Sequence, residues 1–457
     1  MRTHFSSLPA GFISLLALLF ILAGCGESAG SPTTLPSDPA TSNLTLNLPL
    51  PSYPLTAAQM GVVVAEGDVL SEAIASYYQS ARGIPAANII RVKLSTGVDS
   101  ISAANFATVK AEVDAKLPAG VQTTLLTWNA PSRVAGSCSM SITSAMAFGF
   151  DAKYCANTCS STAASAYYDS ESSQPWQDLK IRPAMMLGAS SLSAAKALID
   201  RGVQADNSQP IGDGYLLRTN DSNRSVRYTD YLALPSAWAG RLQLNYLDNS
   251  AGTGSNSISG KSNLLFYFTG LSSVANLSSN QFLPGAIADH LTSYGGFLPT
   301  GNGQMPISAW LEAGATASYG TVAEPCNFTQ KFSRASILID QYYRGATLIE
   351  AYWKAVEWPG QGLFVGEPLA RPFADQASFK IVRNQYQIST RALRPNSLYV
   401  LEYLNRNTWT TLARFNIAVA KPQILSAPLA PASASQLRWQ GPCPNNASKQ
   451  CTLSQSF

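Results

Sequence analysis

The stretch MGVVVA at Met60–Ala65 is a short apolar run followed by a Glu-Gly-Asp turn, which is typical of a buried strand. Ser71–Arg82 has apolar residues at helical spacing, and the Gly-Ile-Pro sequence after it ends the predicted helix. Asn88–Leu94 predicts a second strand, Phe106–Lys116 a second helix and Thr123–Trp128 a third strand. This β-α-β-α-β order is the signature of a mostly parallel sheet with helices on its faces.

The chain continues this alternation up to residue 375. Further strands are expected at Ala184–Gly188, Tyr215–Arg218, Leu242–Leu247, Leu264–Phe268 and Ala315–Val322, and helices at Ser193–Arg201, Ala286–Ser293, Pro306–Ala313, Ile337–Tyr343 and Leu348–Val356. Residues 56–375 are therefore predicted to form one α/β domain, with helices on both faces of the sheet. The polar, Ser-rich stretch 135–180 is interpreted as a long excursion held by disulfides.

The pattern changes near residue 376. Phe379–Arg391, Ser397–Leu404 and Trp409–Ala418 alternate apolar and polar residues, with Pro and Asn turns between them. Such alternation is typical of antiparallel strands with one buried face. Residues 376–457 are predicted to be a small C-terminal antiparallel β module.

The N-terminus carries the features of a secretion signal. Arg2 provides a positive start, and residues 11–23 are almost wholly apolar but too few to span a bilayer. The sequence Leu22-Ala23-Gly24-Cys25 resembles the bacterial lipobox, which predicts removal of residues 1–24 and lipidation of Cys25. A plain signal peptide with a coincidental cysteine is the alternative. Gly26, where an inner-membrane lipoprotein has Asp, resembles the Gram-negative signal for the outer membrane.

Residues 25–55 are predicted to be a flexible tether between this lipid anchor and the α/β domain. They are rich in Ser, Thr, Pro, Gly and Asn, and the only charged residues are Glu27 and Asp38. Such a segment buries too little apolar surface to offset its ordering entropy. A lipoprotein terminus with three acyl chains would hold this tether stably on a membrane, whereas one chain binds only marginally.

The composition bounds the possible partners. Apolar residues make up 46% of the chain and charged residues 13%, which is typical of a protein that builds a large core. The net charge is +4, and it becomes +3 once Arg2 is removed with the signal. The sequence has no cluster of Lys and Arg such as a phosphate-binding face requires, which argues against nucleic acid as a partner.

Six cysteines remain besides Cys25, and an even number in an exported chain favours disulfides. Cys443 and Cys451 are close in sequence and are expected to pair. The other four are Cys138, Cys155, Cys159 and Cys326, which are expected to form two bridges with a pairing left open. A metal site is the rival interpretation, but no metal is predicted, because the sequence has no Cys-x-x-Cys pair and His290 is the only histidine outside the signal.

Five stretches together resemble an uncharacterised family of exported bacterial proteins, over roughly residues 57–375. They are ASYYQSARGIP at Ala75–Pro85, IDRG at Ile199–Gly202, GATASYGTVAEPC at Gly314–Cys326, YRGATLIEAYW at Tyr343–Trp353 and VGEPLARP at Val365–Pro372. Gly345–Ala351 and the turn Gly366–Pro368 are also distantly similar to gingipain-like, caspase-fold cysteine peptidases. That resemblance implies a caspase-like α/β sandwich.

The catalytic residues of such peptidases are missing from this chain. In them a His-Gly pair follows one buried strand and a Cys follows the next. Here Thr269-Gly270 follows the apolar run at Leu264–Phe268, and no Cys occurs near Gly295-Gly296-Phe297. The resemblance therefore implies a catalytically silent relative, or one with other chemistry.

Two sets of residues are candidates for chemistry. His290 and Cys326 form the one remaining Cys/His combination, which requires a direct hydrogen bond to act as a dyad. The alternative is that His290 packs on a helix and Cys326 belongs to a disulfide.

Carboxylates at predicted strand ends form the second set. Glu324, with Glu66, Asp68 and Glu367, could converge to bind a cation or act as acid and base. The alternative is that these carboxylates stabilise turns. Arginines that could pair with them, or with an anionic ligand, are Arg82, Arg133, Arg201, Arg224 and Arg227.

Together these features predict a lipid-anchored outer-membrane protein with a non-catalytic, caspase-like binding domain. The alternative is a hydrolase or peptidase with a degenerate site. No cofactor is expected. The expected partners are the membrane, through the lipid, and a protein or other cell-envelope component.

Overall fold

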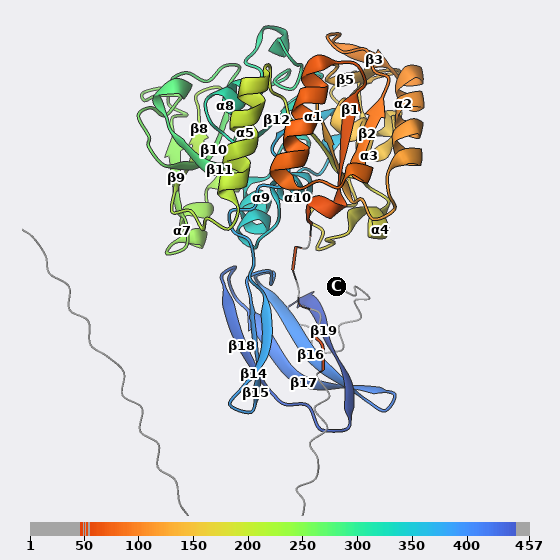
Figure 1. Cartoon of the computed structure of the whole chain (residues 1–457). Coiled ribbons are helices and arrows are strands. Elements are labelled where there is room, and N and C mark those ends of the chain that lie inside the picture. Colours follow the sequence, from red (N-terminus) through yellow and green to blue (C-terminus); the bar gives the residue numbers. More distant parts are fainter. Residues whose placement is uncertain (1–45, 49, 51, 54, 445–457) are drawn as a thin grey trace, which may run out of the picture. The chain divides into compact units, whose positions relative to one another are not determined.

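The computed structural model describes residues 46–48, 50, 52, 53 and 55–444. Ten strands form a central sheet in the order β2-β1-β4-β7-β13-β12-β11-β10-β8-β9 (Figure 1). These strands are β1 (Met60–Ala65), β2 (Ile89–Val92), β4 (Thr123–Leu126), β7 (Ala184–Met186), β8 (Asp213–Arg218), β9 (Gln243–Asp248), β10 (Leu264–Gly270), β11 (Phe282–Leu291), β12 (Ala317–Thr321) and β13 (Gly362–Gly366). The predicted α/β class with a mostly parallel sheet is confirmed.

The sheet consists of two parallel blocks that run in opposite directions. β2, β1, β4, β7 and β13 are parallel to one another, and so are β12, β11, β10, β8 and β9. The blocks meet where β12 pairs antiparallel with β13, with Ala317 opposite Gly366. The carboxyl ends of the two blocks therefore lie at opposite edges of the sheet. Both blocks contain the same arrangement of their first four strands, β2-β1-β4-β7 in one and β9-β8-β10-β11 in the other.

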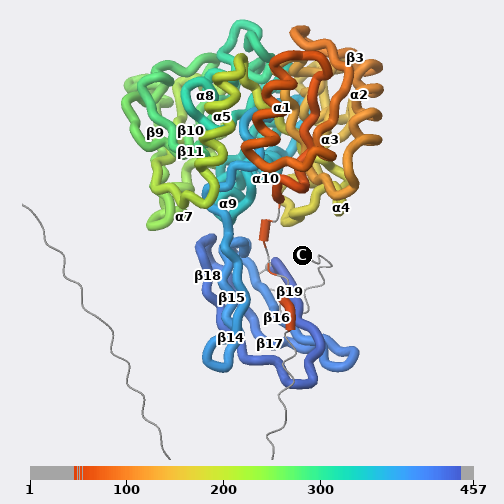
Figure 2. The backbone as a smooth tube through the Cα atoms, viewed as in Figure 1, coloured from red at the N-terminus to blue at the C-terminus, as the bar shows by residue number. Residues whose placement is uncertain are grey.

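Helices pack on both faces of this sheet. They are α1 (Val69–Arg82), α2 (Ala103–Lys116), α3 (Ile142–Phe148), α4 (Pro175–Leu179), α5 (Leu192–Ala205), α6 (Tyr228–Tyr231), α7 (Leu234–Trp238), α8 (Ser308–Glu312), α9 (Ala335–Tyr343) and α10 (Leu348–Ala355). α1 and α5 lie side by side (Figure 2). On β13, Phe364 stacks against Trp353 of α10, with ring centroids 4.4 Å apart. Its neighbour Val365 is directed toward the other face, since successive side chains on a strand alternate, and that face carries α5 and α8.

Two local predictions in this domain are wrong. The helix expected at Ala286–Ser293 is instead the end of β11, where residues 285–291 are all buried between β10 and β12. A strand covered on both faces has no polar face, so its sequence lacks the alternation that distinguishes a strand from a helix. Residues 135–180 are not an excursion, because Met140, Ile142 and Tyr167 are fully buried in the main core. This region contains α3, α4 and part of a small sheet of β3 (Ser100–Ser102), β5 (Arg133–Ala135) and β6 (Ser139–Ser141).

The C-terminal module contains two antiparallel three-stranded sheets, as its alternating sequence predicts. Their orders are β14-β15-β18 and β17-β16-β19. The strands are β14 (Ser378–Val382), β15 (Gln385–Thr390), β16 (Ser397–Asn405), β17 (Thr408–Ile417), β18 (Gln423–Pro428) and β19 (Ala434–Pro444). The stretch Phe379–Arg391 is two strands, because Arg383 and Asn384 form a hairpin turn with φ values of 49° and 57°.

The last residues of the predicted tether are packed. Leu48 is buried in the core of the C-terminal module with Tyr386 and Leu401. Tyr53 and Leu55 are buried in the core of the α/β domain. The segment from residue 46 to residue 55 thus contributes side chains to both cores. Residues 1–45, with Cys25, lie outside the described part of the chain.

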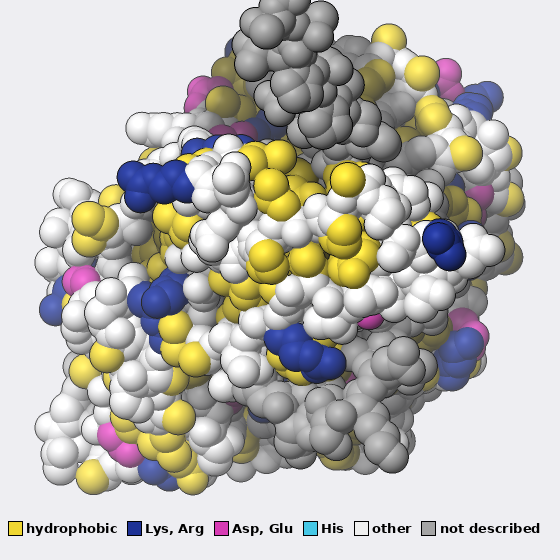
Figure 3. Space-filling model, turned by 90° about the horizontal axis from the view of Figure 1, so that it is seen from below, with side chains coloured by type: hydrophobic (Ala, Val, Ile, Leu, Met, Phe, Trp, Pro, Cys, Tyr) yellow, Lys and Arg dark blue, Asp and Glu magenta, His cyan; other side chains and the backbone are white. Residues whose placement is uncertain are grey.

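Exposed charge is sparse on the face drawn in Figure 3. In the part of this face that is not drawn in grey, the Lys and Arg side chains are scattered among polar and apolar groups.

Within the described residues, no helix combines the length and apolar character needed to cross a bilayer.

Candidate functional site

A cavity of about 310 Å³ lies at the carboxyl ends of β11 and β12. Its base is formed by Leu291, the last residue of β11, and by Thr292 and Ser293, which directly follow it. One wall comes from the loop after β8, and the other from the loop after β12. The remaining lining residues are Cys159, Asn223, Arg224, Glu324, Pro325, Cys326 and Asn327. This volume is at the lower end of the range for small-molecule pockets, roughly 300–1,000 Å³.

Arg224 forms the charged part of the first wall, and its guanidinium is held in place. Nη1 donates to Asp221 Oδ2 at 2.8 Å, and Nε donates to Thr292 Oγ1 at 3.2 Å. The backbone N–H of Arg224 also donates to Asp221 Oδ1 at 3.1 Å. The Arg224 side chain keeps 29% of its surface exposed, so the guanidinium is oriented without being covered.

Gly270 allows this wall to approach the end of β10. A Cβ atom at this position would lie 1.8 Å from the backbone oxygen of Arg224. Thr219 Oγ1 also donates to the backbone oxygen of Gly270 at 2.7 Å. The glycine after Thr269 is therefore required by the close passage of the loop that carries Arg224.

The base of the cavity is fixed by side-chain hydrogen bonds. Thr292 Oγ1 donates to Gln304 Oε1 at 2.7 Å, and this Gln304 oxygen also accepts the N–H of Tyr294 at 2.9 Å. Thr321 Oγ1, at the end of β12, lies 2.9 Å from the backbone oxygen of Ser293. These bonds position Ser293 at the surface of the cavity.

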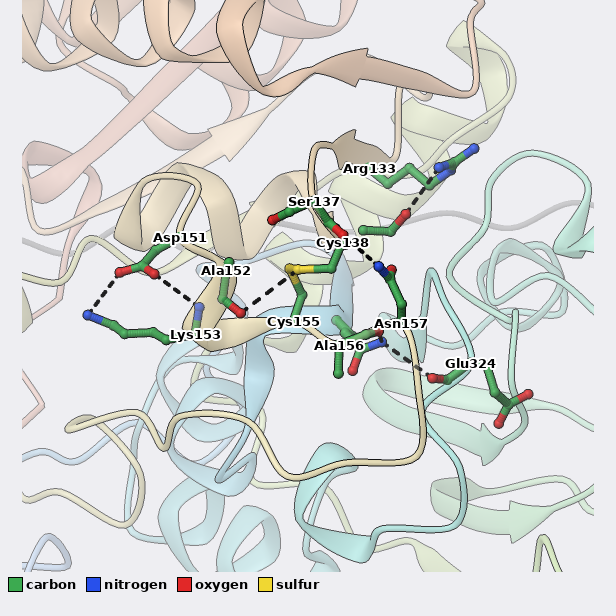
Figure 4. Close-up of a disulfide and its surroundings, with 12 residues drawn as sticks. Arg133, Ser137, Cys138, Asp151, Ala152, Lys153, Cys155, Ala156, Asn157 and Glu324 are labelled. Atoms are coloured by element: carbon green, nitrogen blue, oxygen red, sulfur yellow. Dashed lines mark hydrogen bonds and ion pairs between the residues drawn. A yellow bond between two sulfur atoms is a disulfide. The ribbon is translucent and has the colours of Figure 1, made fainter.

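The second wall is held by a disulfide between Cys159 and Cys326. Glu324 Oε1 accepts the N–H of Cys326 at 2.8 Å, where Cys326 has a φ of 54°. Behind this wall, Gln361 Nε2 lies near the backbone oxygens of Ala156 and Glu324, at 3.3 and 3.4 Å. Figure 4 shows these two segments next to the neighbouring disulfide.

The cysteine pairing excludes the predicted dyad. Cys138 is bonded to Cys155 and Cys159 to Cys326, so the expectation of two bridges among these four is confirmed. Cys326 has no thiol to donate to His290. Cys443 is also in a disulfide, and its expected partner Cys451 lies outside the described residues.

His290 lies on β11 and is fully buried, and it does not line the cavity. Trp310 Nε1 donates to its Nδ1 at 2.9 Å. Burial, and then the positive charge of Arg227, lower its pKa to about 3. Its accepting nitrogen is thus occupied and its charged form is disfavoured, so His290 cannot act as a base for a ligand in the cavity. The alternative that His290 packs on a helix is wrong about the element, because its segment is the strand β11.

The predicted convergence of carboxylates is wrong. Glu66 and Asp68 follow β1, and Glu367 follows β13, whereas Glu324 follows β12 in the block of opposite direction. Glu324 therefore lies at the other edge of the sheet. Among the described residues, no group of three His, Cys, Asp or Glu side chains could hold a metal ion.

Four of the five candidate arginines bind other parts of the fold. Arg82 pairs with Glu367 and Asp206, and Arg227 pairs with Asp289. Arg201 donates to the backbone oxygens of Leu311 and Ala315. Arg133 contacts Ser139 and the Phe297 ring. The alternative that the Glu367 carboxylate bonds a nearby backbone N–H is confirmed, since its Oε1 accepts the N–H of Leu369 at 3.4 Å. Arg224 alone of the five lines the cavity.

Sequence reasoning missed Thr292, Ser293, Asn223 and Asn327. The available signal was the run of polar residues directly after β11, but the wrong helix prediction for 286–293 concealed it. Had that segment been assigned as a strand, Thr292 and Ser293 would have been expected at its carboxyl end, where sites in α/β folds gather. No protein-family model, curated protein or solved structure matches this chain.

Proposed function

We propose that this chain is a lipid-anchored bacterial envelope protein whose α/β domain is caspase-like and binds a ligand without catalysis. The observation that supports this proposal best is the cavity at the end of β11. β10 and β11 are adjacent and parallel, with Thr269 opposite His290 and Gly270 opposite Leu291. The caspase-like resemblance assigns a His-Gly pair to the end of the first strand and a Cys to the end of the second.

This chain has Thr269-Gly270 and Leu291-Thr292-Ser293 at those two ends. A cavity lies at the second of these ends, and its walls are held by a disulfide and by the Arg224–Asp221 pair. None of the described lining residues is a free thiol or an imidazole. A nucleophile without an adjacent base loses its usual activation, so the geometry favours binding over covalent chemistry.

The binding role is tested by a thermal-shift screen of small polar molecules against residues 26–457. The expected result is one or more ligands that raise the melting temperature and whose effect is lost in Ser293→Trp, which fills the cavity. A matched control is Ser255→Trp, on an exposed loop away from the cavity. Ligands that bind the wild type and Ser293→Trp equally would contradict a binding role for this cavity.

The same protein is assayed against a mixed library of peptide and ester substrates, which tests the hydrolase alternative. We expect no turnover. Turnover that disappears in Ser293→Ala, and survives in His290→Gln, would replace the binding proposal with a hydrolase that uses Ser293.

The lipid anchor is tested separately, by metabolic labelling of cells with a palmitate analogue. The wild type is expected to incorporate the label and Cys25→Ser to lose it. Equal labelling of both proteins would reject Cys25 as the lipidated residue. This outcome would leave the binding proposal intact.

A further inference from the structure

We propose that the cavity binds a small zwitterion, with the size of an amino acid or dipeptide, whose carboxylate pairs with Arg224 and whose ammonium group pairs with Glu324. This inference rests on the proposed binding function of the same cavity.

Arg224 presents a prepared binding group for a carboxylate. Its Nη1 and Nε each have a protein acceptor, on Asp221 and Thr292. Within the described residues, no oxygen is bonded to its Nη2. Because a guanidinium binds carboxylates through two of its N–H groups, a ligand can use Nη2 and the second hydrogen of Nη1. The cost of ordering this long side chain has already been met by folding.

Glu324 presents the opposite charge from the other wall. Its Oε1 has one contact, the N–H of Cys326. In the described part of the chain, no Lys, Arg or His forms an ion pair with this carboxylate. Burial lowers the pKa of Lys331 to about 8 and the charge of Glu324 opposes this, but the Lys331 Nζ donates to Gln361 Oε1 at 2.8 Å and makes no ion pair with Glu324. The disulfide at Cys326 limits the movement of the loop that carries Glu324.

The two charges reach the cavity from neighbouring strand ends. The guanidinium of Arg224 is bonded to Thr292 at the end of β11, and Glu324 follows β12, the strand next to it. Both side chains line the same cavity of about 310 Å³, which is large enough to hold an amino acid or a dipeptide.

The rest of the lining is uncharged. Ser293, Asn223 and Asn327 offer hydrogen bonds, whereas Leu291 and Pro325 offer apolar contact. A cationic ligand would pair with Glu324 but leave the free N–H groups of Arg224 unused, and an anionic ligand would use these N–H groups but leave Glu324 without a partner. A zwitterion uses both walls.

The test compares four forms of one dipeptide by isothermal titration calorimetry at low salt. They are alanyl-alanine, its N-acetyl derivative, its C-terminal amide, and the N-acetyl amide, which carry both charges, the negative charge, the positive charge and no charge, respectively. The zwitterion is expected to bind tightest, by about tenfold or more over either singly charged form.

Each wall is then altered in turn. Arg224→Gln is expected to remove the preference for a free carboxylate, and Arg224→Lys to retain part of it without the guanidinium fork. Glu324→Gln is expected to remove only the preference for a free ammonium group. Arg218→Gln is the control, because Arg218 is at the end of the same strand β8 but pairs with Asp248 and does not line the cavity.

Two results would overturn the inference. One is equal affinity for all four dipeptide forms. The other is an Arg224→Gln variant that still prefers the free carboxylate. If the dipeptides fail to bind while a screening ligand binds and is blocked by Ser293→Trp, the zwitterion is rejected and the binding function stands. If no ligand binds in either experiment, both proposals fail.

Discussion

Arg344 and Glu171 are joined by two parallel hydrogen bonds, with Nη1 donating to Oε2 and Nη2 to Oε1, each at 2.9 Å. The Arg344 side chain is fully buried. Its Nε donates to Asp340 Oδ2 at 2.8 Å, and its Nη1 also donates to the backbone oxygen of Ala392 at 2.8 Å. Burial by itself would raise the pKa of Glu171, but Arg344 holds that pKa below its usual value. This one side chain links the end of α9, the loop before α4 and the loop between β15 and β16.

Replacement of Arg344 by Met is therefore expected to be strongly destabilising. It leaves Glu171 and Asp340, whose side chains are only 10% and 20% exposed, without their main partner, and breaking a buried pair in this way typically costs about 3–5 kcal/mol. Urea denaturation at pH 7 measures the loss. The matched control is Arg91→Met, because Arg91 is 52% exposed and its pair with Glu72 is expected to contribute only about 0.2–1 kcal/mol. Similar losses in the two variants would contradict this account of the Arg344 cluster.

The segment 46–55 is expected to be part of the folded protein. A chain that begins at residue 56 loses the buried side chains of Leu48, Tyr53 and Leu55, each of which contributes roughly 1.5–3 kcal/mol. A chain that begins at residue 46 retains them. The comparison is made by urea denaturation of the two chains, with a single variant beside them.

That variant is Tyr53→Phe, which removes only the hydroxyl that donates to Gln341 Oε1 at 2.7 Å. Its expected cost is about 0.5–1.5 kcal/mol, because the ring stays in the core. If the chain that begins at residue 56 is as stable as the longer one, the buried segment makes no contribution and the tether extends to residue 55.

His290 is expected to make folding stability depend on pH between 6.5 and 5. Its pKa falls from 6.5 to about 3 on folding, mainly because the ring is buried. Below pH 6.5 the unfolded chain therefore binds a proton that the folded chain excludes. The full contribution is present well above pH 6.5, and stability decreases as the pH falls, by about 2 kcal/mol at pH 5.

Denaturation at pH 7, 6 and 5 measures this effect, and His290→Gln is expected to remove it. The sequence has one other histidine, His4, which is within the predicted signal peptide. A chain without residues 1–24 therefore has His290 as its single histidine, and its titration can be assigned to that ring. The ring proton resonances of His290 are expected to stay constant from pH 7 to pH 4. A midpoint near 6 in that titration would show that the ring is accessible and would reject the buried assignment.

The disulfide between Cys159 and Cys326 is expected to contribute more stability than the one between Cys138 and Cys155. It joins residues 167 positions apart, against 17 for the other bridge, and a longer loop loses more entropy when it is closed. Replacing the pair by Ser is expected to cost about 2–4 kcal/mol.

Hydrogen exchange adds a local measurement to this prediction. Loss of the longer bridge is expected to raise exchange at residues 324–327 beside the cavity, and loss of the shorter bridge is expected to leave them unchanged. Equal stability losses with no local change at 324–327 would mean that the second wall does not depend on its disulfide.

Much of the fold could be predicted from particular residues. The Val62–Val64 run and the Leu264–Phe268 run are fully buried strands, because continuous apolar stretches of this length fit the interior of a covered sheet. The alternation in Ser397–Leu404 predicts an antiparallel strand, which is observed. The even set of cysteines predicts disulfides because thiols in exported proteins are usually oxidised.

The site could be predicted much less well. Glu324 and Glu367 both follow predicted strands, yet they lie at opposite edges because β12 and β13 run in opposite directions. Strand direction depends on long-range pairing, which local composition does not contain. The cavity arises in the same way, since Arg224, Ser293 and Glu324 come from three separate loops.

By itself, the sequence determined where many of the apolar strands and helices form, because hydrophobic periodicity is a local property of the chain, but it did not distinguish a helix from a buried strand at 286–291. It also determined the candidate lipidation motif at Cys25 and the absence of a catalytic His-Gly pair after Leu264–Phe268. Only the tertiary structure decided that His290 is enclosed beside Trp310, that Cys326 is bonded to Cys159, and that Arg224 and Glu324 share one cavity. These relationships depend on which strands are neighbours and on their directions, which are set by the packing of the whole sheet.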